Sequence, residues 1–384
     1  MQEKIKAVIM RGGTSKALFF HKNHLPRNPL LRDSIILSAF GSPDPFRRQI
    51  DGLGGAVSST SKVAIISPSK DPRYDVIYFF GQVSIDRPIV DYRGNCGNIS
   101  AAVGPFAIDE GLVSAEEPLT RVRIHQKNSD RLIVAEVPVL NGSYQEEGDF
   151  AIDGVPGTGG KITLHFMDPG GAITGKLLPT GKPQETMKIP GMGSIPVSIV
   201  DATHPTVYLR AKDLGLKGAE IGEIEGNEEL MGRLERIRAE AAVWIGTAQT
   251  AEEASAKVQT VPRIAIVAPP MDYRAIDGRE ISAREIDLTA RILSMGTLHR
   301  AFAATGAVCT AVAAKIEGTL VHEALRREAL DRTDIFLGHP SGIMAVGALV
   351  ERRGREFFCR EAITYRTARR LMEGYVYVRR RSQD

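Results

Sequence analysis

Short apolar runs bounded by Gly, Pro or Asp are the commonest pattern along the chain. Three of these runs predict strands, because β-branched and aromatic residues favour strands: residues 76–80, 132–135 and 264–267. Apolar residues at helical spacing are fewer, and they predict helices over residues 228–243, 286–302 and 367–372. Ser282 and Glu285 form a capping-box pattern ahead of the second helix. Strands and helices without regular alternation are typical of an α+β fold.

The chain also repeats itself weakly. Residues 13–20 align with residues 202–209, at an offset of 202 − 13 = 189. Residues 96–103 align with residues 305–312, at an offset of 305 − 96 = 209. A third match, of residues 110–113 with 317–321, follows in the same order. Coincidence of common dipeptides is the alternative, but three ordered matches favour two copies of one architecture.

The boundary between the two copies is expected between Thr180 and Ile199. Residues 181–196 are rich in Gly and Pro, as a linker would be. We therefore expect an N-terminal domain over residues 1–185 and a C-terminal domain over residues 186–384, with the option that the C-terminal tail returns to the first domain.

Composition and charge exclude several classes of protein. A hydrophobic content of 43% and a charged content of 25% are those of a soluble globular protein, and no uninterrupted apolar stretch predicts a membrane span. The net charge is only +3, and the one basic run, Arg379 to Arg381, is interpreted as a solvated tail, so no nucleic-acid partner is expected. The 3 cysteines show no C-x-x-C spacing, which argues against a disulfide framework and predicts a cytoplasmic location.

Cys96 is the strongest candidate for chemistry. Asn95, Gly97 and Asn98 surround it, and a run of small apolar residues follows, which predicts a turn that enters a buried helix. Unpaired N–H groups at a helix start favour an anion, so they favour a thiolate and can hold a substrate carboxylate. The alternative is an inert buried cysteine, but the flanking Gly and Asn residues favour a functional one.

The second copy offers different groups at the matching place. Thr305, Gly306 and Ala307 can present N–H groups to an anion, but a threonine hydroxyl does not ionise near neutral pH and is a poor base. Cys309 follows one helical turn later, so we expect it to pack in the core. Stereoinversion at one carbon, which needs a base on each face, is therefore disfavoured.

Four stretches together resemble one family: residues 10–16 (MRGGTSK), 94–100 (GNCGNIS), 338–342 (GHPSG) and 366–374 (RTARRLMEG). They look like the PrpF family of the diaminopimelate epimerase-like superfamily, which includes 2-methylaconitate isomerase, 3-methylitaconate Δ-isomerase and 4-oxalomesaconate tautomerase. Residues 91–96 and the length look most like the methylitaconate branch. The resemblance implies two pseudo-repeated α+β domains, each with a curved, mostly antiparallel sheet around a central helix, and an active site in the cleft between them.

The resemblance also implies a lysine partner for Cys96, and the matching lysine is Lys62. Lys62 opens an apolar strand-like run after a Gly- and Ser-rich loop, and a lysine held against apolar surface can serve as a base. The alternative is a strand-edge lysine with its amine in water. Candidate substrate-binding residues are Gly12, Gly13, Thr14, Ser15, Gly97, Asn98, Thr305, Gly306, Ala307, His339 and Ser341.

The sequence therefore predicts an isomerase that shifts an allylic proton on a small unsaturated di- or tricarboxylate. Cys96 and Lys62 are the expected acid/base pair, with no cofactor and no metal, and a homo-oligomer (dimer or tetramer) is expected. The alternatives are an oxalomesaconate-type tautomerase, an amino-acid epimerase or racemase, and a non-catalytic accessory protein of an aconitase-type enzyme.

Overall fold

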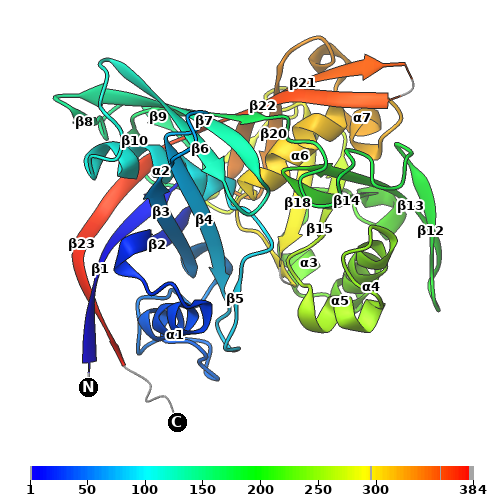
Figure 1. Ribbon diagram of the computed structural model, residues 1–384. Coiled ribbons are helices and arrows are strands. Elements are labelled where there is room, and N and C mark those ends of the chain that lie inside the picture. The colour runs from blue at the N-terminus through cyan, green and yellow to red at the C-terminus, as the bar shows by residue number, and fades with distance from the viewer. Residues whose placement is uncertain (1, 295, 355, 380–384) are drawn as a thin grey trace. The chain divides into compact units, whose positions relative to one another are not determined.

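The computed structural model describes residues 2–294, 296–354 and 356–379 (Figure 1). The chain forms two compact units, Met1–Leu164 with Arg366–Asp384, and His165–Tyr365. The C-terminal segment thus belongs to the first unit, the option that the sequence left open. This division lies about twenty residues before the expected boundary, and Arg380 and Arg381 of the basic run fall outside the described residues.

In the first unit the strands pair in the order β23, β1, β2, β3, β4, β6, β7. The elements of this unit are β1 Gln2–Gly12, β2 Ser15–His21, α1 Pro29–Phe40, β3 Lys62–Pro68, β4 Val76–Val83, β5 Val90–Asp91, α2 Gly97–Asp109, β6 Leu119–Gln126, β7 Arg131–Leu140, β8 Ser143–Tyr144, β9 Phe150–Ala151, β10 Thr158–Gly159 and β23 Ala368–Arg379. The strand β11 (Ile162–Met167) leads into the second unit.

The helix α2 is the centre of the first unit, and the sheet surrounds it (Figure 1). It packs against β1, β2, β3, β4, β6, β7 and β23, and its residues 97–108 are all buried. Small side chains permit this close approach: a Cβ on Gly104 would lie 2.7 Å from Val137 Cγ2. A helix that is buried all round needs the nearly continuous small and apolar run that the sequence provides.

In the second unit the strands pair in the order β12, β13, β14, β15, β18, β20, β21, β22. The elements of this unit are β12 Glu185–Ile189, β13 Gly193–Ala202, β14 His204–Arg210, α3 Gly222–Glu225, α4 Glu228–Trp244, α5 Ala251–Lys257, β15 Arg263–Ala268, β16 Tyr273–Arg274, β17 Glu280–Ile281, β18 Leu288–Ser294, β19 Thr297–Leu298, α6 Ala304–Ala314, α7 Leu320–Ala324, β20 Asp334–His339, β21 Gly342–Arg353 and β22 Glu356–Arg366. The helix α6 is fully buried against β13, β14, β20 and β21.

The two units repeat one architecture, which confirms the internal repeat. From β1 to β7, successive pairings run antiparallel, parallel, antiparallel, parallel, antiparallel, and from β13 to β21 they run the same way. Ser15 and His204 open equivalent strands, which agrees with the offset of 189. The helices, however, begin at Gly97 and Ala304, an offset of 304 − 97 = 207 rather than 209.

This shift of two residues changes which residues correspond. Cys96 is the N-cap of α2, and its counterpart is Ala303, the N-cap of α6. Thr305 corresponds to Asn98 instead of Cys96. The conclusion that the second copy lacks a matching acid/base group becomes firmer, because an alanine side chain cannot titrate.

Several predicted elements are confirmed and others are wrong. The three predicted strands lie within β4, β7 and β15, and the helix predicted over residues 228–243 is α4. The helix predicted over residues 286–302 is instead β18 and β19, and the one predicted over residues 367–372 opens β23. The supposed linker, residues 181–196, contains β12 and the start of β13.

The failure at β18 has a physical cause. The strand is paired on both sides, with β15 and β20, and its residues 288–293 are all buried. A strand without a solvent face loses its apolar–polar alternation and resembles a buried helix in its pattern. Ser282 and Glu285 do interact, since the Ser282 N–H donates to Glu285 Oε2 at 2.9 Å, but they close a turn rather than cap a helix.

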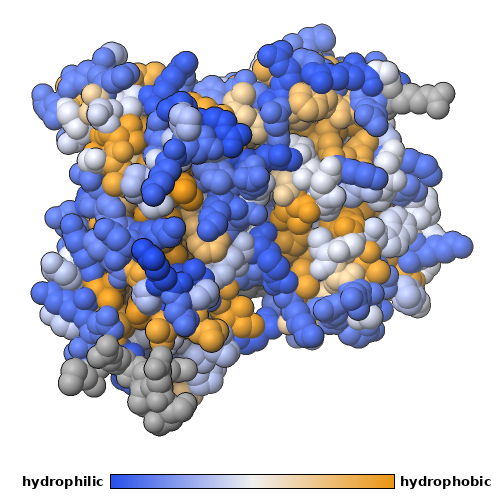
Figure 2. All heavy atoms as spheres, viewed as in Figure 1, coloured by the Kyte–Doolittle hydropathy of each residue, from blue (hydrophilic) through white to orange (hydrophobic). Residues whose placement is uncertain are grey.

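Hydrophilic residues cover much of the face drawn in Figure 2, with apolar side chains between them. The most exposed large apolar side chains, Leu30, Phe46 and Ile50, belong to the first unit. Among the described residues, no helix has both the length and the apolar character that a bilayer span requires.

Candidate active site

Cys96 lies where the sequence places it, at the start of the central helix of the first unit. Its backbone is extended, with φ −120° and ψ 100°, and the residue is 8% exposed. Its carbonyl accepts hydrogen bonds from the Ser100 N–H at 2.9 Å and the Ser100 hydroxyl at 3.0 Å, which close the first turn. The N–H groups of residues 97–99 make no bonds within the helix, an arrangement that favours an anion.

The loop between β1 and β2 meets this helix start. The Asn98 side-chain amide donates to Thr14 Oγ1 at 3.0 Å. A Cβ on Gly12 would lie 2.4 Å from the Asn98 carbonyl oxygen, and a Cβ on Gly13 would lie 2.3 Å from Asn98 Oδ1. Gly13 also has a positive φ of 49°. Only glycine allows the loop this close, so the structure brings these predicted residues together with Gly97.

One N–H group of the β1–β2 loop is already hydrogen-bonded within the protein. The Gly13 N–H donates to the Thr367 carbonyl at 2.9 Å, and the Arg11 guanidinium donates to the same carbonyl at 3.0 Å. Ser15 is buried, 3% exposed. The Gly13 N–H is therefore bonded to the C-terminal segment, and Thr14 is the loop residue whose hydroxyl accepts a hydrogen bond from Asn98.

Lys62 is the first residue of β3 and is buried, 8% exposed. Its amine donates to Gln82 Oε1 at 2.6 Å and lies 5.4 Å from the centre of the Phe80 ring. The amide of Gln82 in turn donates to the carbonyls of Ser61 at 2.9 Å and Ser58 at 3.1 Å, which fixes the orientation of its oxygen. The amine is thus held in place inside the unit, and the alternative of a solvated strand-edge lysine does not fit.

Arg366 is a buried residue of this region that the sequence patterns did not single out. It is 2% exposed, and its Nε donates to Asn98 Oδ1 at 3.1 Å. Burial lowers the pKa of its guanidinium to about 10, while the charge of Cys96 acts in the opposite direction. The only signal in the sequence was that Arg366 opens one of the four family stretches.

The second unit carries a fixed cation at the place of Lys62. Arg263 opens β15 and pairs with Thr206, as Lys62 opens β3 and pairs with Ala17. The Arg263 guanidinium donates to Thr305 Oγ1 at 2.5 Å. Each unit therefore has an arginine bonded to the second residue of its central helix, Asn98 in one and Thr305 in the other.

A buried histidine that interacts with Arg263 stays uncharged. His204 is buried, and burial together with the charge of Arg263 holds the pKa of its imidazole well below the ordinary value. The imidazole Nδ1 lies 3.2 Å from the Pro205 carbonyl. The second unit thus presents a permanent positive charge near its helix start.

A family model described as PrpF protein matches residues 2–379. The chain belongs to the PrpF family. Its relatives include 3-methylitaconate isomerase of Eubacterium barkeri, 48% identical over 98% of this chain and 98% of that one. They also include 2-methyl-aconitate isomerase of Shewanella oneidensis, 42% identical over 98% of this chain and 97% of that one.

Solved structures share the fold of this PrpF protein. A crystal structure of methylitaconate-delta-isomerase matches with a TM-score of 0.81 and 48% identity, over 98% of this chain and 96% of that one. A hydroxyproline epimerase from Agrobacterium vitis matches with a TM-score of 0.56 and 12% identity, over 97% and 92% of the two chains. The second match shows the fold alone, and it agrees with the epimerase-like α+β architecture.

The remaining predicted residues of the PrpF protein lie in the second unit. His339 and Ser341 form the turn between β20 and β21, where the Ser341 N–H donates to His339 Nδ1 at 3.2 Å. The Ser341 hydroxyl donates to the Arg300 carbonyl at 2.6 Å. The Ala307 N–H donates to the Ala303 carbonyl at 2.8 Å within α6, so it is not offered to an anion as expected. Gly306 lies before it in the first turn, where N–H groups make no bonds within the helix.

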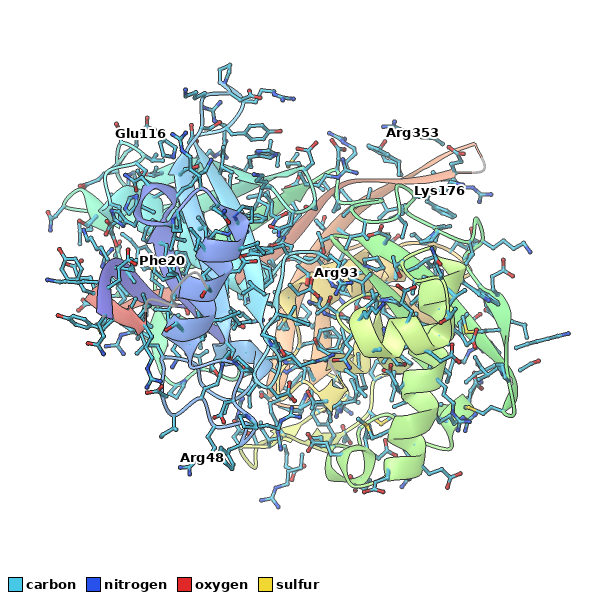
Figure 3. All side chains as sticks on the ribbon, turned by 60° about the horizontal axis from the view of Figure 1, so that its bottom comes forward. Phe20, Arg48, Arg93, Glu116, Lys176 and Arg353 are labelled. Atoms are coloured by element: carbon cyan, nitrogen blue, oxygen red, sulfur yellow. The ribbon has the colours of Figure 1, made fainter. Side chains whose placement is uncertain are left out.

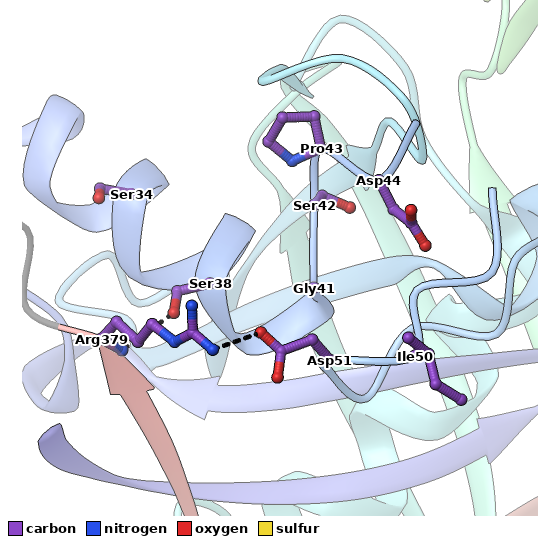
Figure 4. A pocket seen from close by; sticks show the side chains of 9 residues that line it. All are labelled: Ser34, Ser38, Gly41, Ser42, Pro43, Asp44, Ile50, Asp51 and Arg379. Carbon is purple, nitrogen blue, oxygen red and sulfur yellow. Dashed lines mark hydrogen bonds and ion pairs between the residues drawn. The ribbon is translucent and has the colours of Figure 1, made fainter. Parts of the chain in front are cut away.

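A pocket of about 400 Å³ in the first unit is lined by other residues (Figure 4). Asp51 pairs there with the Arg379 guanidinium at 2.9 Å. Asp44 accepts the N–H groups of Phe46, Arg48 and Gln49, and these bonds hold the pKa of its carboxyl below the ordinary value. Arg379 offsets the charge of Asp51, so the lining keeps one net negative charge from Asp44, which disfavours a carboxylate substrate.

Replacing Cys309 with alanine should leave turnover near normal and lower the free energy of unfolding by about 1 kcal/mol. Cys309 is fully buried, its thiol donates to the Val200 carbonyl at 3.2 Å, and burial raises its pKa to about 11. Denaturant unfolding and a turnover assay on the same sample check this. Loss of turnover in a folded Cys309→Ala protein would contradict the assignment of Cys309 to the core.

Proposed function

We propose that this PrpF protein is a cofactor-free isomerase that moves a double bond in a small unsaturated di- or tricarboxylate of the 3-methylitaconate or 2-methylaconitate type. The observation that carries the proposal is the 48% identity to 3-methylitaconate isomerase over 98% of both chains. The match extends over nearly the whole of both chains.

Lys62 and Cys96 are the proposed acid/base pair. An allylic shift removes a proton from one carbon and adds a proton to another, so it needs two groups that serve two positions. Both residues belong to the first unit and are buried to the same extent, at 8% exposure. The counterparts in the second unit, Arg263 and Ala303, cannot exchange a proton near neutral pH. This asymmetry supports a double-bond shift over inversion at one carbon.

The proposed reaction balances in protons and electrons. One group takes the proton from the allylic carbon. The C–H electron pair is delocalised over the allyl unit and the carboxylate conjugated with it, which gives a dienolate. The other group then delivers a proton to the far carbon, and either residue can take the first step. The N–H groups at the start of α2, with Gly97, Asn98 and Thr14 beside them, are the proposed contacts for the dienolate carboxylate.

Proton exchange tests the proposal directly. The protein is incubated in deuterated water with itaconate-, aconitate- and mesaconate-type acids, and proton NMR follows both label and isomer. We expect deuterium at the allylic positions and formation of the shifted isomer from 3-methylitaconate or 2-methylaconitate. The Cys96→Ser protein is the control, because contaminating activity would persist in it.

The other outcomes separate the alternatives. Conversion of a 4-oxalomesaconate-type acid alone would favour the tautomerase. Exchange of the α-proton of an amino acid would favour an epimerase, and the absence of exchange in every acid would favour an accessory protein. A homo-oligomer and a cytoplasmic location stay predictions, and sedimentation equilibrium measures the first of them.

A further inference from the structure

Gln82 on β4 lies opposite Lys62 on β3, and its side chain ties the Lys62 amine to the loop that precedes β3. The residue is buried, at 7% exposure. Its Oε1 accepts a hydrogen bond from the Lys62 amine at 2.6 Å, and its Nε2 donates to the carbonyls of Ser61 at 2.9 Å and Ser58 at 3.1 Å. Three hydrogen bonds thus meet at one carboxamide beside a proposed proton-transfer group, and the proposed proton shift gives that carboxamide no role.

These bonds leave a single orientation for the Gln82 carboxamide. The reverse orientation would set its oxygen against two carbonyl oxygens, so two hydrogen bonds would become two repulsive contacts. The Lys62 amine therefore meets an acceptor at Gln82. Hydrogen bonds from a charged donor are stronger than those from a neutral one, so this acceptor holds the ammonium form of the amine most firmly.

Ser61 is not free to shift and release Gln82, because it is held as well. Ser61 is fully buried, its carbonyl also accepts the Val83 N–H at 3.0 Å, and its hydroxyl donates to Gln49 Oε1 at 2.7 Å. The same Gln49 oxygen accepts the Ala56 N–H at 2.8 Å. Two buried glutamines thus bind Ser61 from two sides and anchor the loop that leads into β3.

Gln49 turns inward from a surface loop at a conformational cost. Arg48, labelled in Figure 3, lies exposed at the surface, whereas Gln49 is only 1% exposed. Gln49 has a φ of 49°, and Ala56, whose N–H it accepts, has a φ of 62°. Left-handed backbone is unfavourable for a residue with a Cβ, and it persists where the surrounding contacts impose it. The bonds of Gln49 therefore hold the loop ahead of Lys62 in one conformation.

The second unit shows that the fold does not require a carboxamide at this position. Continued by one residue, the antiparallel register of β15 with β18 places Ser294 opposite Arg263, as Gln82 lies opposite Lys62. Ser294 is therefore the counterpart of Gln82. A glutamine accompanies the residue that can exchange a proton, and a serine accompanies the arginine that cannot.

We propose that Gln82 is a positioning residue for Lys62: its carboxamide, held by the carbonyls of Ser58 and Ser61, fixes the amine and the direction in which the amine exchanges a proton. A lysine nitrogen has three positions besides its bond to carbon. One N–H points at Gln82, so the lone pair of the neutral amine is restricted to the other two. The proposal rests on the proposed function, in which Lys62 transfers a proton. Gln82 contributes no proton itself, because a carboxamide does not ionise near neutral pH.

Carbamoylation by cyanate tests the proposal without using turnover. Cyanate reacts with the neutral amine, and peptide mass spectrometry measures the modification of Lys62 relative to Lys315, whose amine is bonded to backbone carbonyls of the second unit. Removing an acceptor frees the amine and disfavours its ammonium form, so Gln82→Met should raise this ratio by about tenfold. Gln82→Glu sets a carboxylate beside the amine and should lower the ratio below that of the unsubstituted protein.

Gln126→Met is the matched control. Gln126 is a fully buried glutamine of the same unit, and its carboxamide bonds Asn128 Oδ1 at 2.6 Å and the Ser129 N–H at 2.8 Å, in the turn after β6. This variant should be less stable and leave the ratio unchanged. If Gln82→Met fails to fold, Gln82→Ser, which copies the second unit, gives the same readout. A folded Gln82→Met or Gln82→Ser protein with an unchanged ratio would overturn the proposal, and so would a Gln82→Glu protein that is not modified more slowly.

Turnover adds a second readout. A misplacement of about 1 Å can cost about 10²-fold in rate, so Gln82→Met should lower kcat per folded molecule by about 10–100-fold and change KM little. A rise in KM alone would make Gln82 a substrate contact and contradict the positioning role. An active Lys62→Ala protein would overturn the proposed acid/base pair. An inactive Lys62→Ala protein beside a fully active Gln82→Met protein would overturn the positioning role alone.

Discussion

Lys62→Ala should abolish isomerisation in a protein that still folds. The Lys62 amine is one of the two proposed proton-transfer groups, and such a group is typically worth about 10²–10⁴-fold in rate. The variant leaves Gln82 anchored to the carbonyls of Ser58 and Ser61, so the surrounding strands keep their contacts. NMR turnover measures the activity, and thermal unfolding shows that the fold remains.

Lys62→Arg should fail as well, and this variant separates charge from proton transfer. A guanidinium keeps the positive charge but does not release its proton near neutral pH. The fold accepts an arginine at this kind of strand start, since Arg263 occupies the equivalent position in the second unit. Loss of activity in Lys62→Arg would therefore report the missing proton transfer, and substantial activity would rule out Lys62 as an acid or base.

Two control variants, Lys315→Ala and Thr305→Ala, test whether the loss of activity is specific to Lys62. Lys315 is a partly buried lysine of the second unit, and its amine donates to the carbonyls of Ala329 at 2.7 Å and Leu330 at 2.9 Å. Lys315→Ala should lower stability and keep turnover.

Thr305→Ala should be far milder than Lys62→Ala and act mainly on binding. An inactive Thr305→Ala protein beside an active Lys62→Ala protein would contradict the proposed acid/base pair.

The pattern of apolar and polar residues within single segments was enough to predict many of the helices and strands. It failed where strand pairing determines which residues are buried. The strand over residues 76–80 and the helix over residues 228–243 carry their own signals, in β-branched runs and in helical spacing. The strand β18 does not, because pairing on both sides buries every residue of its apolar stretch. The sequence alignment of the repeat was wrong by two residues for a different reason: the exact start of each central helix is seen only in the structure. The observed N-caps show that Ala303 corresponds to Cys96.

In the candidate site too, some residues were indicated by local motifs and others only by contacts between distant segments. The Gly and Asn residues around Cys96, together with the family resemblance, were enough to indicate Cys96 and Lys62. Arg366 meets Asn98 across 268 residues of sequence, and no local pattern measures that distance. The equivalence of Arg263 with Lys62 follows from strand register alone. The positions of the buried arginines near the helix starts therefore follow from contacts between distant segments, and the motifs could not predict them.

Cys96→Ser should lower turnover by about 10²–10⁴-fold without loss of stability. A serine hydroxyl does not ionise near neutral pH, so it cannot replace the thiol in proton transfer. Serine is also a preferred N-cap, whereas Cys96 makes no capping bond with its side chain. The free energy of unfolding should therefore stay the same or rise while the activity disappears. Retention of more than about a tenth of the activity would show that Cys96 is not essential.

Cys96→Ala completes the test, because it removes the thiol without supplying a cap. A serine at the N-cap can accept the N–H of residue 98 or 99, and alanine cannot. Both variants should lose the same activity, but Cys96→Ala should be less stable than Cys96→Ser, by about 1 kcal/mol. Equal turnover with unequal stability would assign the loss to chemistry. If turnover instead followed stability across the pair, Cys96 would act through the fold, and the acid/base assignment would be wrong.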